Sequence, residues 1–277
     1  MHNFFLRLNN WSMKSNVDMV DPICLRPASP SQRAMARKQR ARGEPMFIAD
    51  WDRVLMIHFS VDAKLLQHDI PFELDLWDGR AFVSLVAFTM RGMRPAFGGC
   101  VTSWVFRPLA THDFLNVRTY VRDGGDNGIH FLAGWVSSRL AQALGPRTFS
   151  LPYRLGRMDY CNDWRLGVLS GRVEDAATGD AFSYQAELDT SAGFSECRPG
   201  SLDEWLMERY SAFNAARDRK KNFWVWHEPW RQCKASVDIT NSTSLTVNWN
   251  WFARAELIGA NYSPGNQDVW LGRPHRI

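Results

Sequence analysis

Hydrophobic and polar positions alternate with the period of β-strands through much of the chain. Segment 79–89 (GRAFVSLVAFT) is almost continuously apolar and rich in β-forming residues, which is typical of a strand buried on both faces. In segment 114–122, one face carries Leu115, Val117, Thr119 and Val121, and the other carries Asn116, Arg118, Tyr120 and Arg122. The sequence GGDNG (124–128) then leads into IHFLAGW, which predicts a β-hairpin.

Further strands are expected on both sides of the turn-rich sequence DAATGD, over 164–173 and 181–188. Two aromatic segments, FWVWHEPW (223–230) and SLTVNWNWF (244–252), have the composition of strands as well. Strands therefore dominate, and no regular alternation of strands and helices is present. This pattern predicts a mainly β protein with a few helices (α+β), built on a large, curved antiparallel sheet or barrel.

Two helices are indicated by their caps. Ser138 can cap a short helix that Gly145-Pro146 ends. Ser201 begins the sequence SLDE, a capping box with Glu204 at the third helical position, and an amphipathic stretch follows as far as Phe213. We expect both helices to pack on the sheet.

The net charge of +4 is confined to the start of the chain. Residues 1–45 hold eight basic and three acidic side chains, whereas the remainder holds 25 basic and 26 acidic ones. Segment 26–45 has almost no bulky apolar residues, so it cannot bury enough surface to offset the entropy of ordering. We predict a disordered basic extension over residues 1–45, or a true start at Met46, and a single domain over residues 46–277.

Several classes of protein are disfavoured by what the sequence lacks. We find no secretory signal and no run of about eighteen apolar residues, which predicts no membrane partner. The five cysteines are dispersed, which favours a cytoplasmic protein with reduced thiols. The seven histidines have no metal-site spacing, and common nucleotide-binding and hydrolase motifs are missing. We therefore expect no metal and no cofactor, and a homo-oligomer stays open.

The polar face of segment 114–122 is the first candidate for a binding site. Asn116, Arg118 and Tyr120 line the interior of a barrel if the opposite, apolar face packs on helices. An inward arginine is suited to a carboxylate or phosphate, which its fork of donors binds in a bidentate way. The alternative is an ordinary solvent-facing strand surface.

Two other segments carry groups with possible chemistry. In LPYRLGRM (151–158), Tyr153 and Arg154 suit the recognition of an anion or a carbonyl group, although such a segment is commonly a strand edge. In WHEPW (226–230), His227 and Glu228 suggest an acid–base pair. Adjacent residues of a strand point to opposite faces, so an aromatic core segment with one satisfied histidine is the preferred interpretation.

Five phrases of the sequence occur together in a distinctive order. They are IPFELDLWDGRAFVSLVAFTMRGMRP (70–95), FLNVRTYVRDGGDNGIHFLA (114–133), FSLPYRLGRM (149–158), SLDEWLMERYSAF (201–213) and HEPW (227–230). In wording and order they resemble the YqjF-like family, number 2071 among the domains of unknown function, which is grouped by fold with acetoacetate decarboxylase. The resemblance covers 46–230. It implies a closed, cone-like antiparallel β barrel with helices outside and an apolar central cavity.

The resemblance also allows a test for the chemistry of the decarboxylase. That enzyme forms a Schiff base through the first of two lysines that follow a proline. The best match here is Pro152-Tyr153-Arg154, so a tyrosine stands where the nucleophile would be and Arg154 keeps only the charge. Tyrosine cannot form an imine with a ketone. Phe114 stands where the family leads us to expect an acidic residue. A Schiff-base decarboxylase is therefore not expected, and whether the chain is an enzyme stays open.

Three functions are compatible with these features. The favoured one is binding of a small carbonyl- or carboxylate-bearing molecule in the barrel, with polar contacts from Asn116, Arg118, Tyr120, Tyr153 and Arg154. The second is a lysine-independent lyase or isomerase in which Tyr153 is the catalytic acid and Arg118 stabilises an enolate. The third and least favoured is binding of nucleic acid or an acidic partner through residues 1–45.

Overall fold

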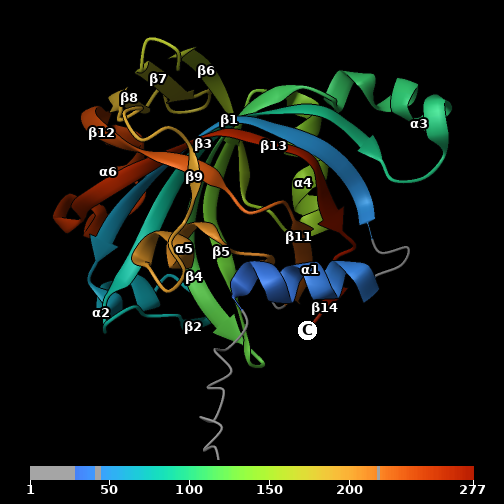
Figure 1. Ribbon diagram of the computed structural model, residues 1–277, viewed down its shortest axis with the longest axis horizontal. Helices are drawn as coiled ribbons and strands as arrows, with labels where there is room; N and C mark the ends of the chain where they lie inside the picture. The colour runs from blue at the N-terminus through green and yellow to red at the C-terminus, as the bar shows by residue number, and fades with distance from the viewer. Residues whose placement is uncertain (1–28, 41–44, 217–218) are drawn as a thin grey trace, which may run out of the picture.

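The computed structural model describes residues 29–40, 45–216 and 219–277, and a β-sheet that closes on itself dominates it (Figure 1). Nine strands form the ring, in the order β5-β6-β7-β8-β12-β13-β1-β3-β4, and the β4–β5 hairpin completes it. In chain order they are β1 (Pro45–Val61), β3 (Ala81–Pro95), β4 (His112–Asp123), β5 (Asp126–Val136), β6 (Tyr153–Asp163), β7 (Val168–Asp175), β8 (Ala181–Leu188), β12 (Arg231–Ser242) and β13 (Glu256–Gly272). The predicted mainly β fold with a barrel is confirmed. The sheet is mixed, because β5 runs parallel to β6.

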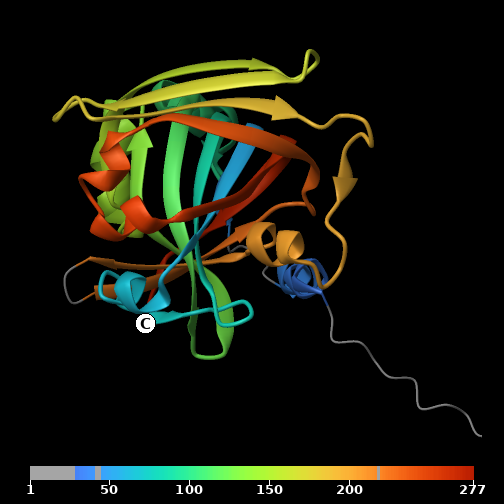
Figure 2. The ribbon, with the colours of Figure 1, turned by 90° about the vertical axis from the view of Figure 1, so that its left-hand side faces the viewer.

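Two further strands, β10 (Ser211–Ala216) and β11 (Arg219–Trp226), form a second closed wall outside the nine-stranded ring. β10 pairs with β5, and β11 pairs with both β10 and β13. In Figure 2, β6, β7 and β8 form the upper wall of the ring, on the side away from β10 and β11. The strands β1, β3, β4, β5 and β13 are therefore common to two enclosures.

The alternation of residues along β4 distributes them between these enclosures. Leu115 and Val117 belong to a core to which all nine strands of the ring contribute apolar side chains. Arg118 and Tyr120 point the other way, where β10, β11 and α5 (Leu202–Met207) cover them. The polar face of β4 is thus enclosed inside the protein. This agrees with the interpretation of a barrel interior and not with that of a solvent-facing strand surface. The apolar face belongs to the core inside the ring, which strands surround and to which the short helices α6 (Thr243–Thr246) and η2 (Asn250–Arg254) also contribute side chains.

The helices confirm their predicted starts but not their predicted ends. The Ser138 hydroxyl caps α4 (Arg139–Phe149), and the Ser201 hydroxyl accepts a hydrogen bond from the Glu204 amide at the start of α5. Helix α4 continues past Gly145-Pro146 to Phe149. Gly145 does not end the helix, and it leaves room for the ring of Tyr153, which a Cβ at this position would overlap. Helix α5 ends at its sixth residue, and the amphipathic stretch continues as strand β10.

The prediction of a strand over 244–252 is wrong. This segment contains helix α6 (Thr243–Thr246) and most of the 3-10 helix η2 (Asn250–Arg254). Leu245, Trp249 and Phe252 are buried in the core of the nine-stranded ring. Leu245 lies in α6, Phe252 lies in η2, and Trp249 lies between them in extended backbone, so burial of these side chains in the core outweighs the β-propensity of the aromatic residues.

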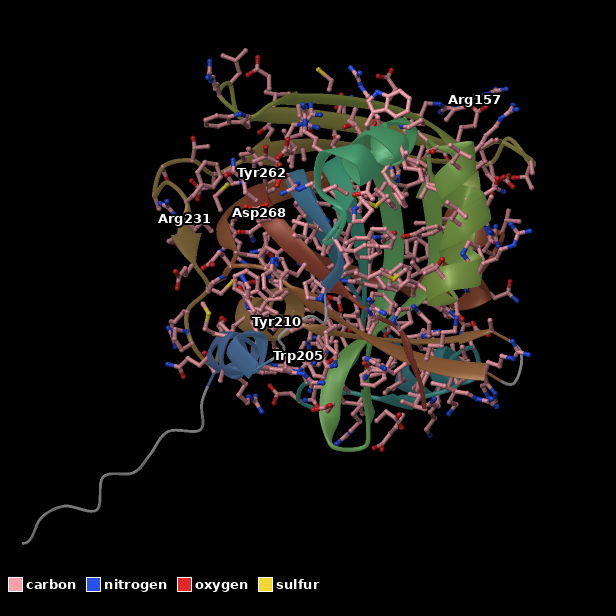
Figure 3. All side chains as sticks on the ribbon, turned by 90° about the vertical axis from the view of Figure 1, so that its right-hand side faces the viewer. Arg157, Trp205, Tyr210, Arg231, Tyr262 and Asp268 are labelled. Carbon is pink, nitrogen blue, oxygen red and sulfur yellow. The ribbon has the colours of Figure 1, made fainter. Side chains whose placement is uncertain are left out.

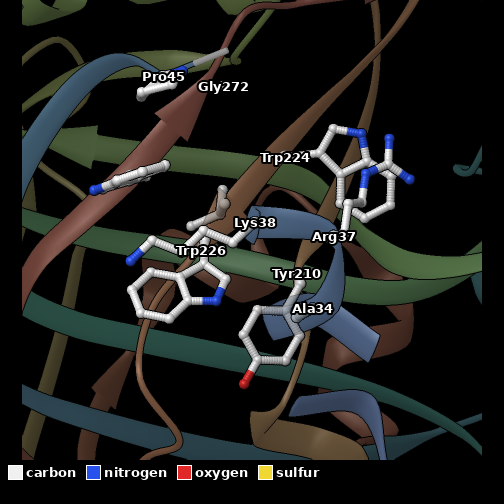
Figure 4. A pocket seen from close by; sticks show the side chains of 10 residues that line it. Ala34, Arg37, Lys38, Pro45, Tyr210, Trp224, Trp226 and Gly272 are labelled. Carbon is white, nitrogen blue, oxygen red and sulfur yellow. The ribbon is translucent and has the colours of Figure 1, made fainter. Parts of the chain in front are cut away.

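Residues 30–40 also differ from the prediction, since they form helix α1 (Pro30–Arg40) rather than a disordered extension. Ala34 is buried, the Arg37 guanidinium lies 3.0 Å from the centre of the Trp224 ring, and the Lys38 ammonium lies 3.0 Å from that of Trp226 (Figure 4). The helix needs few apolar side chains of its own because the tryptophans supply the apolar surface. The other residues of the predicted extension, 1–28 and 41–44, lie outside the described residues.

The remaining elements are short. They are α2 (Ala63–Gln67), β2 (Glu73–Leu74), α3 (Gly99–Phe106), the 3-10 helix η1 (Arg107–Leu109), β9 (Ser195–Glu196) and β14 (His275–Arg276). Over the described part of the chain, no helix has both the length and the apolar character needed to cross a membrane.

Candidate functional site

An apolar cavity of about 320 Å³ lies between the sheet and helix α4. Strands β1, β3 and β4 contribute to one side of it, and α4, β11 and the segment from Phe106 to Leu109 contribute to the others. Its apolar walls include Phe47, Phe88, Met90, Phe114, Leu144 and Phe149. None of the described residues that line the cavity is charged at neutral pH, since their polar members are only Trp, His, Asn, Thr and Tyr side chains.

Two of the predicted site residues, Asn116 and Tyr153, meet on the wall of this cavity. Asn116 of β4 pairs with Gly134 of β5, and Gly134 pairs with Tyr153 of β6. A Cβ on Gly134 would lie 2.8 Å from Tyr153 Cδ1 and 3.1 Å from Asn116 Oδ1. The two side chains therefore flank the bare glycine backbone from both sides, and glycine is the residue that lets them approach.

Neither of these two side chains forms a hydrogen bond with another described residue. Asn116 Oδ1 is buried without a partner, and the Tyr153 hydroxyl makes no hydrogen bond to any described residue. Burial raises the pKa of Tyr153 well above its ordinary value, so the hydroxyl keeps its proton and can donate it to an acceptor. An unpaired buried amide costs free energy, which makes this pair a candidate for a ligand contact.

Two further polar groups line the same cavity. The pKa of His112 is lowered to about 4, mainly because burial disfavours the charged ring, while the nearby Leu109 carbonyl and Asp113 oppose this shift. His112 is therefore neutral at physiological pH. The indole Nε1 of Trp51 is buried and has no hydrogen-bond acceptor among the described residues. The cavity thus offers neutral donors and acceptors in an otherwise apolar surface.

Arg118 and Tyr120, also predicted to bind a ligand, do not line this cavity. Arg118 Nη2 donates to the Leu206 carbonyl at 3.2 Å and contacts Met56 Sδ at 3.4 Å, while its Nε has no partner. The Tyr120 hydroxyl donates to the same carbonyl at 3.0 Å. Both side chains project from the same face of β4 as Asn116, but they are fixed under α5.

A buried chain of hydrogen bonds beside Arg118 was not predicted from the sequence. His58, Ser84 and Arg118 lie opposite one another on three neighbouring strands. The Ser84 hydroxyl is 2.5 Å from the Tyr120 hydroxyl and 2.7 Å from His58 Nδ1. Because Tyr120 gives its proton to a carbonyl, Ser84 must donate to Tyr120, and His58 Nδ1 must carry a proton. Burial, with Arg118 adding to the effect, lowers the pKa of His58 to about 3, so the ring is neutral.

Arg154 is separated from the other predicted site residues. Its Nη1 lies 3.7 Å from Asp175 Oδ2, its side chain is 42% exposed, and its guanidinium lies over the Trp135 ring. Trp135 belongs to the core of the nine-stranded ring, whereas Tyr153 lines the cavity. Arg154 therefore does not contribute a cation to the cavity.

The sequence phrases SLDEWLMERY and HEPW meet in one buried cluster. The Tyr210 hydroxyl and the Trp230 amide both donate to the Glu208 carboxylate, and the Tyr210 ring stacks on His227 at 4.6 Å between centroids. Burial lowers the pKa of His227 to about 4, and its Nδ1 contacts the Glu228 carbonyl rather than the carboxylate. This cluster joins α5 to the end of β11, and the proposed acid–base pair does not form.

The described residues contain no cluster of histidine, cysteine and acidic side chains that could hold a metal ion. The lysines at 38, 64, 220, 221 and 234, all within the described part of the chain, lie elsewhere than on the cavity wall. None of these five lysines therefore supplies an amine to this cavity. Lys14 lies outside the described residues.

Comparison with solved structures shows the fold. Acetoacetate decarboxylase from Legionella pneumophila matches with a TM-score of 0.57 at 12% identity, over 84% of this chain and 87% of that one. An acetoacetate decarboxylase-like enzyme from Sphingomonas wittichii matches with a TM-score of 0.55 at 16% identity, over 84% of this chain and 94% of that one. The enduracididine biosynthesis enzyme MppR, in complex with pyruvate, matches with a TM-score of 0.57 at 11% identity, over 85% of this chain and 92% of that one. The chain therefore has the acetoacetate decarboxylase-like fold.

Comparison of sequences shows the family. Residues 48–264 match DUF2071, described as "Uncharacterized conserved protein (COG2071)". The chain is also 32% identical to the uncharacterised protein YqjF of Bacillus subtilis over 197 residues, which cover 70% of this chain and 77% of that protein. These two matches agree with the resemblance seen in the sequence, and the chain belongs to the DUF2071 family.

Proposed function

We propose that this protein binds a small, largely apolar and uncharged molecule with a carbonyl group in the cavity beneath α4. The observation that carries the proposal is the pair formed by Asn116 and Tyr153. Both are polar groups on the wall of an apolar cavity without a hydrogen-bond partner among the described residues: Tyr153 can donate through its hydroxyl, and Asn116 can donate through Nδ2 while its buried Oδ1 accepts. A carbonyl oxygen accepts two hydrogen bonds, so one such group can satisfy both donors.

The charge of the cavity narrows the ligand class that the sequence suggested. No cation lines it among the described residues, and Arg118 is engaged beneath α5. A carboxylate would lose its hydration there without gaining a counter-charge, which is unfavourable. A neutral ketone, aldehyde, ester or amide meets no such penalty. The proposal therefore keeps the carbonyl of our sequence-based hypothesis and sets the carboxylate aside.

The enzymatic alternative has less support from the geometry. It required Tyr153 as an acid and Arg118 as the stabiliser of an enolate in one site. Only the tyrosine lines the cavity, and burial raises its pKa, which makes it a weaker acid. The nucleic-acid alternative rested on residues 1–45, of which the described part uses Arg37 and Lys38 in contacts with tryptophan rings.

Thermal denaturation with matched ligands tests the proposed function. We would compare 2-decanone, decane and decanoate, which share one chain length and differ in the polar group. A ligand that binds only the folded protein raises its melting temperature by mass action. We expect the ketone to raise it most, and the carboxylate least.

Two variants locate the effect. Asn116→Leu removes the unpaired amide, so we expect the unliganded protein to be unchanged or more stable and the preference for ketone over alkane to fall about tenfold, as for one lost hydrogen bond. Tyr153→Phe should reduce the same preference. Asn162→Leu, on β6 away from the cavity lining, is the matched control. A ketone preference that survives both cavity variants, or a larger shift with decanoate, would contradict the proposal.

A further inference from the structure

Helices α3 and α4 present an unusual set of exposed apolar side chains. Trp104 is 73% exposed, and Val105, Leu140 and Leu144 are exposed as well, as is Phe97 just before α3. Figure 3 shows both helices on the side of the molecule that faces the viewer, and α3 lies at the outer edge of the ribbon in Figure 1. Single exposed apolar residues are common, but a tryptophan together with several aliphatic neighbours marks an interaction surface.

This apolar surface borders the cavity. Phe106 at the end of α3 and Leu144 in the middle of α4 both line the cavity, and Leu144 is itself exposed. Helix α4 also contacts η1, which directly follows α3. Leu144 on α4 and Phe106 at the end of α3 therefore connect the two helices that carry exposed apolar side chains to the wall of the cavity.

The chain segments that carry these helices contain basic residues but no acidic ones. The segments 91–111 and 137–152, which contain α3, η1 and α4, hold five arginines and no acidic residue. Arg91 and Arg94 form ion pairs with Asp52 and Asp268. The other three, Arg107, Arg139 and Arg147, are exposed, and none forms an ion pair with a described residue. The body of the protein is nearly neutral, so this positive charge is local.

We propose that the α3–α4 surface docks on an anionic lipid layer, with Trp104 and its apolar neighbours in the layer and the three arginines at the phosphate level. Apolar side chains flanked by basic ones are the features of peripheral membrane binding. Such docking needs no membrane-spanning helix, and none is found among the described residues. Tryptophan is suited to this boundary because its ring is apolar and its indole N–H is polar.

Charge distinguishes a lipid layer from a second copy of this chain. A symmetric dimer through the surface would enclose the three arginines of both copies in one interface, with no acidic residue in the two segments to balance them. An anionic lipid surface supplies the missing negative charge. For this reason the observations favour lipid over self-association.

The docking surface also indicates where the cavity ligand comes from, an inference that rests on the proposed function. A neutral carbonyl compound with an apolar chain partitions into lipid. A protein that docks beside the mouth of its own cavity can take up such a molecule without passing it through water. The ligand class is then a membrane-soluble ketone, aldehyde or ester.

Sedimentation with vesicles tests the docking. We would compare the full chain on phosphatidylcholine vesicles with and without about 30% phosphatidylserine. We expect the wild-type protein to bind the anionic vesicles and Trp104→Ser to bind them at least tenfold more weakly. The double variant Arg139→Gln/Arg147→Gln should also bind more weakly than the wild type, and adding Trp104→Ser to it should weaken the binding further. Trp164→Ser removes another exposed tryptophan, on the β6–β7 loop, and serves as the matched control, with unchanged binding.

The outcomes separate this inference from the proposed function. No binding to anionic vesicles, or equal loss with Trp104→Ser and Trp164→Ser, would overturn the docking. A concentration-dependent dimer that Trp104→Ser abolishes, without vesicle binding, would overturn it in favour of self-association. The stabilisation by 2-decanone is measured without lipid, so it can persist when docking fails. Conversely, vesicle binding without a ketone effect would support the surface and contradict only the ligand.

Discussion

The buried ion pair between Asp75 and Arg209 provides a sharp test of the electrostatics beneath α5. We predict that Asp75→Ala lowers the free energy of unfolding by about 3–5 kcal/mol, the range for a buried charge that loses its partner. Arg209 Nη1 lies 2.7 Å from Asp75 Oδ2, and the two side chains are only 5% and 9% exposed. The guanidinium would still donate to the Trp205 carbonyl. It would have no counter-charge, and Arg118 adds repulsion.

An exposed pair of similar length is the control. Arg80 Nη2 lies 2.9 Å from Glu256 Oε2, with side chains 51% and 72% exposed, so Glu256→Ala is expected to cost less than about 1 kcal/mol. Urea unfolding followed by tryptophan fluorescence measures both variants. With a typical slope, the Asp75→Ala midpoint should fall by about 1–2 M urea. Adding Arg209→Met to Asp75→Ala should restore part of the loss. Equal, small losses for the two alanine variants would refute the reasoning.

Two further predictions concern pH and helix capping. Because burial lowers the pKa of His58 to about 3 and of His112 to about 4, the unfolded chain takes up these protons first as the pH falls. The contribution of the two neutral histidines to the free energy of unfolding should therefore be at its full value above about pH 6.5. It should decline toward pH 4 by up to about 1.4 kcal/mol per pH unit for each histidine. His112→Gln should reduce the slope of the unfolding free energy against pH, and an unchanged slope would rule out this contribution. Ser201→Ala removes the hydrogen bond to the Glu204 amide and should cost about 1 kcal/mol in urea unfolding, and a neutral result would show that the cap is dispensable.

The polar residues of β4 show which features the alternation of residues can predict and which it cannot. The alternation correctly placed Asn116, Arg118 and Tyr120 on one face. It could not separate them, because their surroundings are set by β5, β6 and α5, which are distant in sequence. Asn116 lies beside Gly134 at the cavity, whereas the other two lie under Leu206. The local sequence determines which residues share a face of the strand, whereas contacts between distant elements determine which residues share a site.

The two segments that differ from prediction fail for related physical reasons. Residues 244–252 have aromatic residues that favour strands, but two short helices separated by the extended residue Trp249 place Leu245, Trp249 and Phe252 in the core of the ring. Segment 26–45 lacks bulky apolar residues, but Lys38 and its neighbours find apolar surface on Trp226 and Trp270. In both segments the partner surface, rather than the segment's own composition, decides the structure.

Tyr153 connects the fold to the chemistry that the cavity can support. The Gly134 amide donates to the Pro152 carbonyl at 3.2 Å, and the parallel pairing of β5 and β6 then sets Tyr153 beside Gly134 and Asn116. The sequence resemblance places the lysine nucleophile of acetoacetate decarboxylase at this position. A tyrosine whose pKa is raised by burial keeps its proton, so it can donate a hydrogen bond but cannot form an imine. A tyrosine at this place, in a cavity whose described lining has no charge, is therefore consistent with the proposed reversible binding of a neutral carbonyl group.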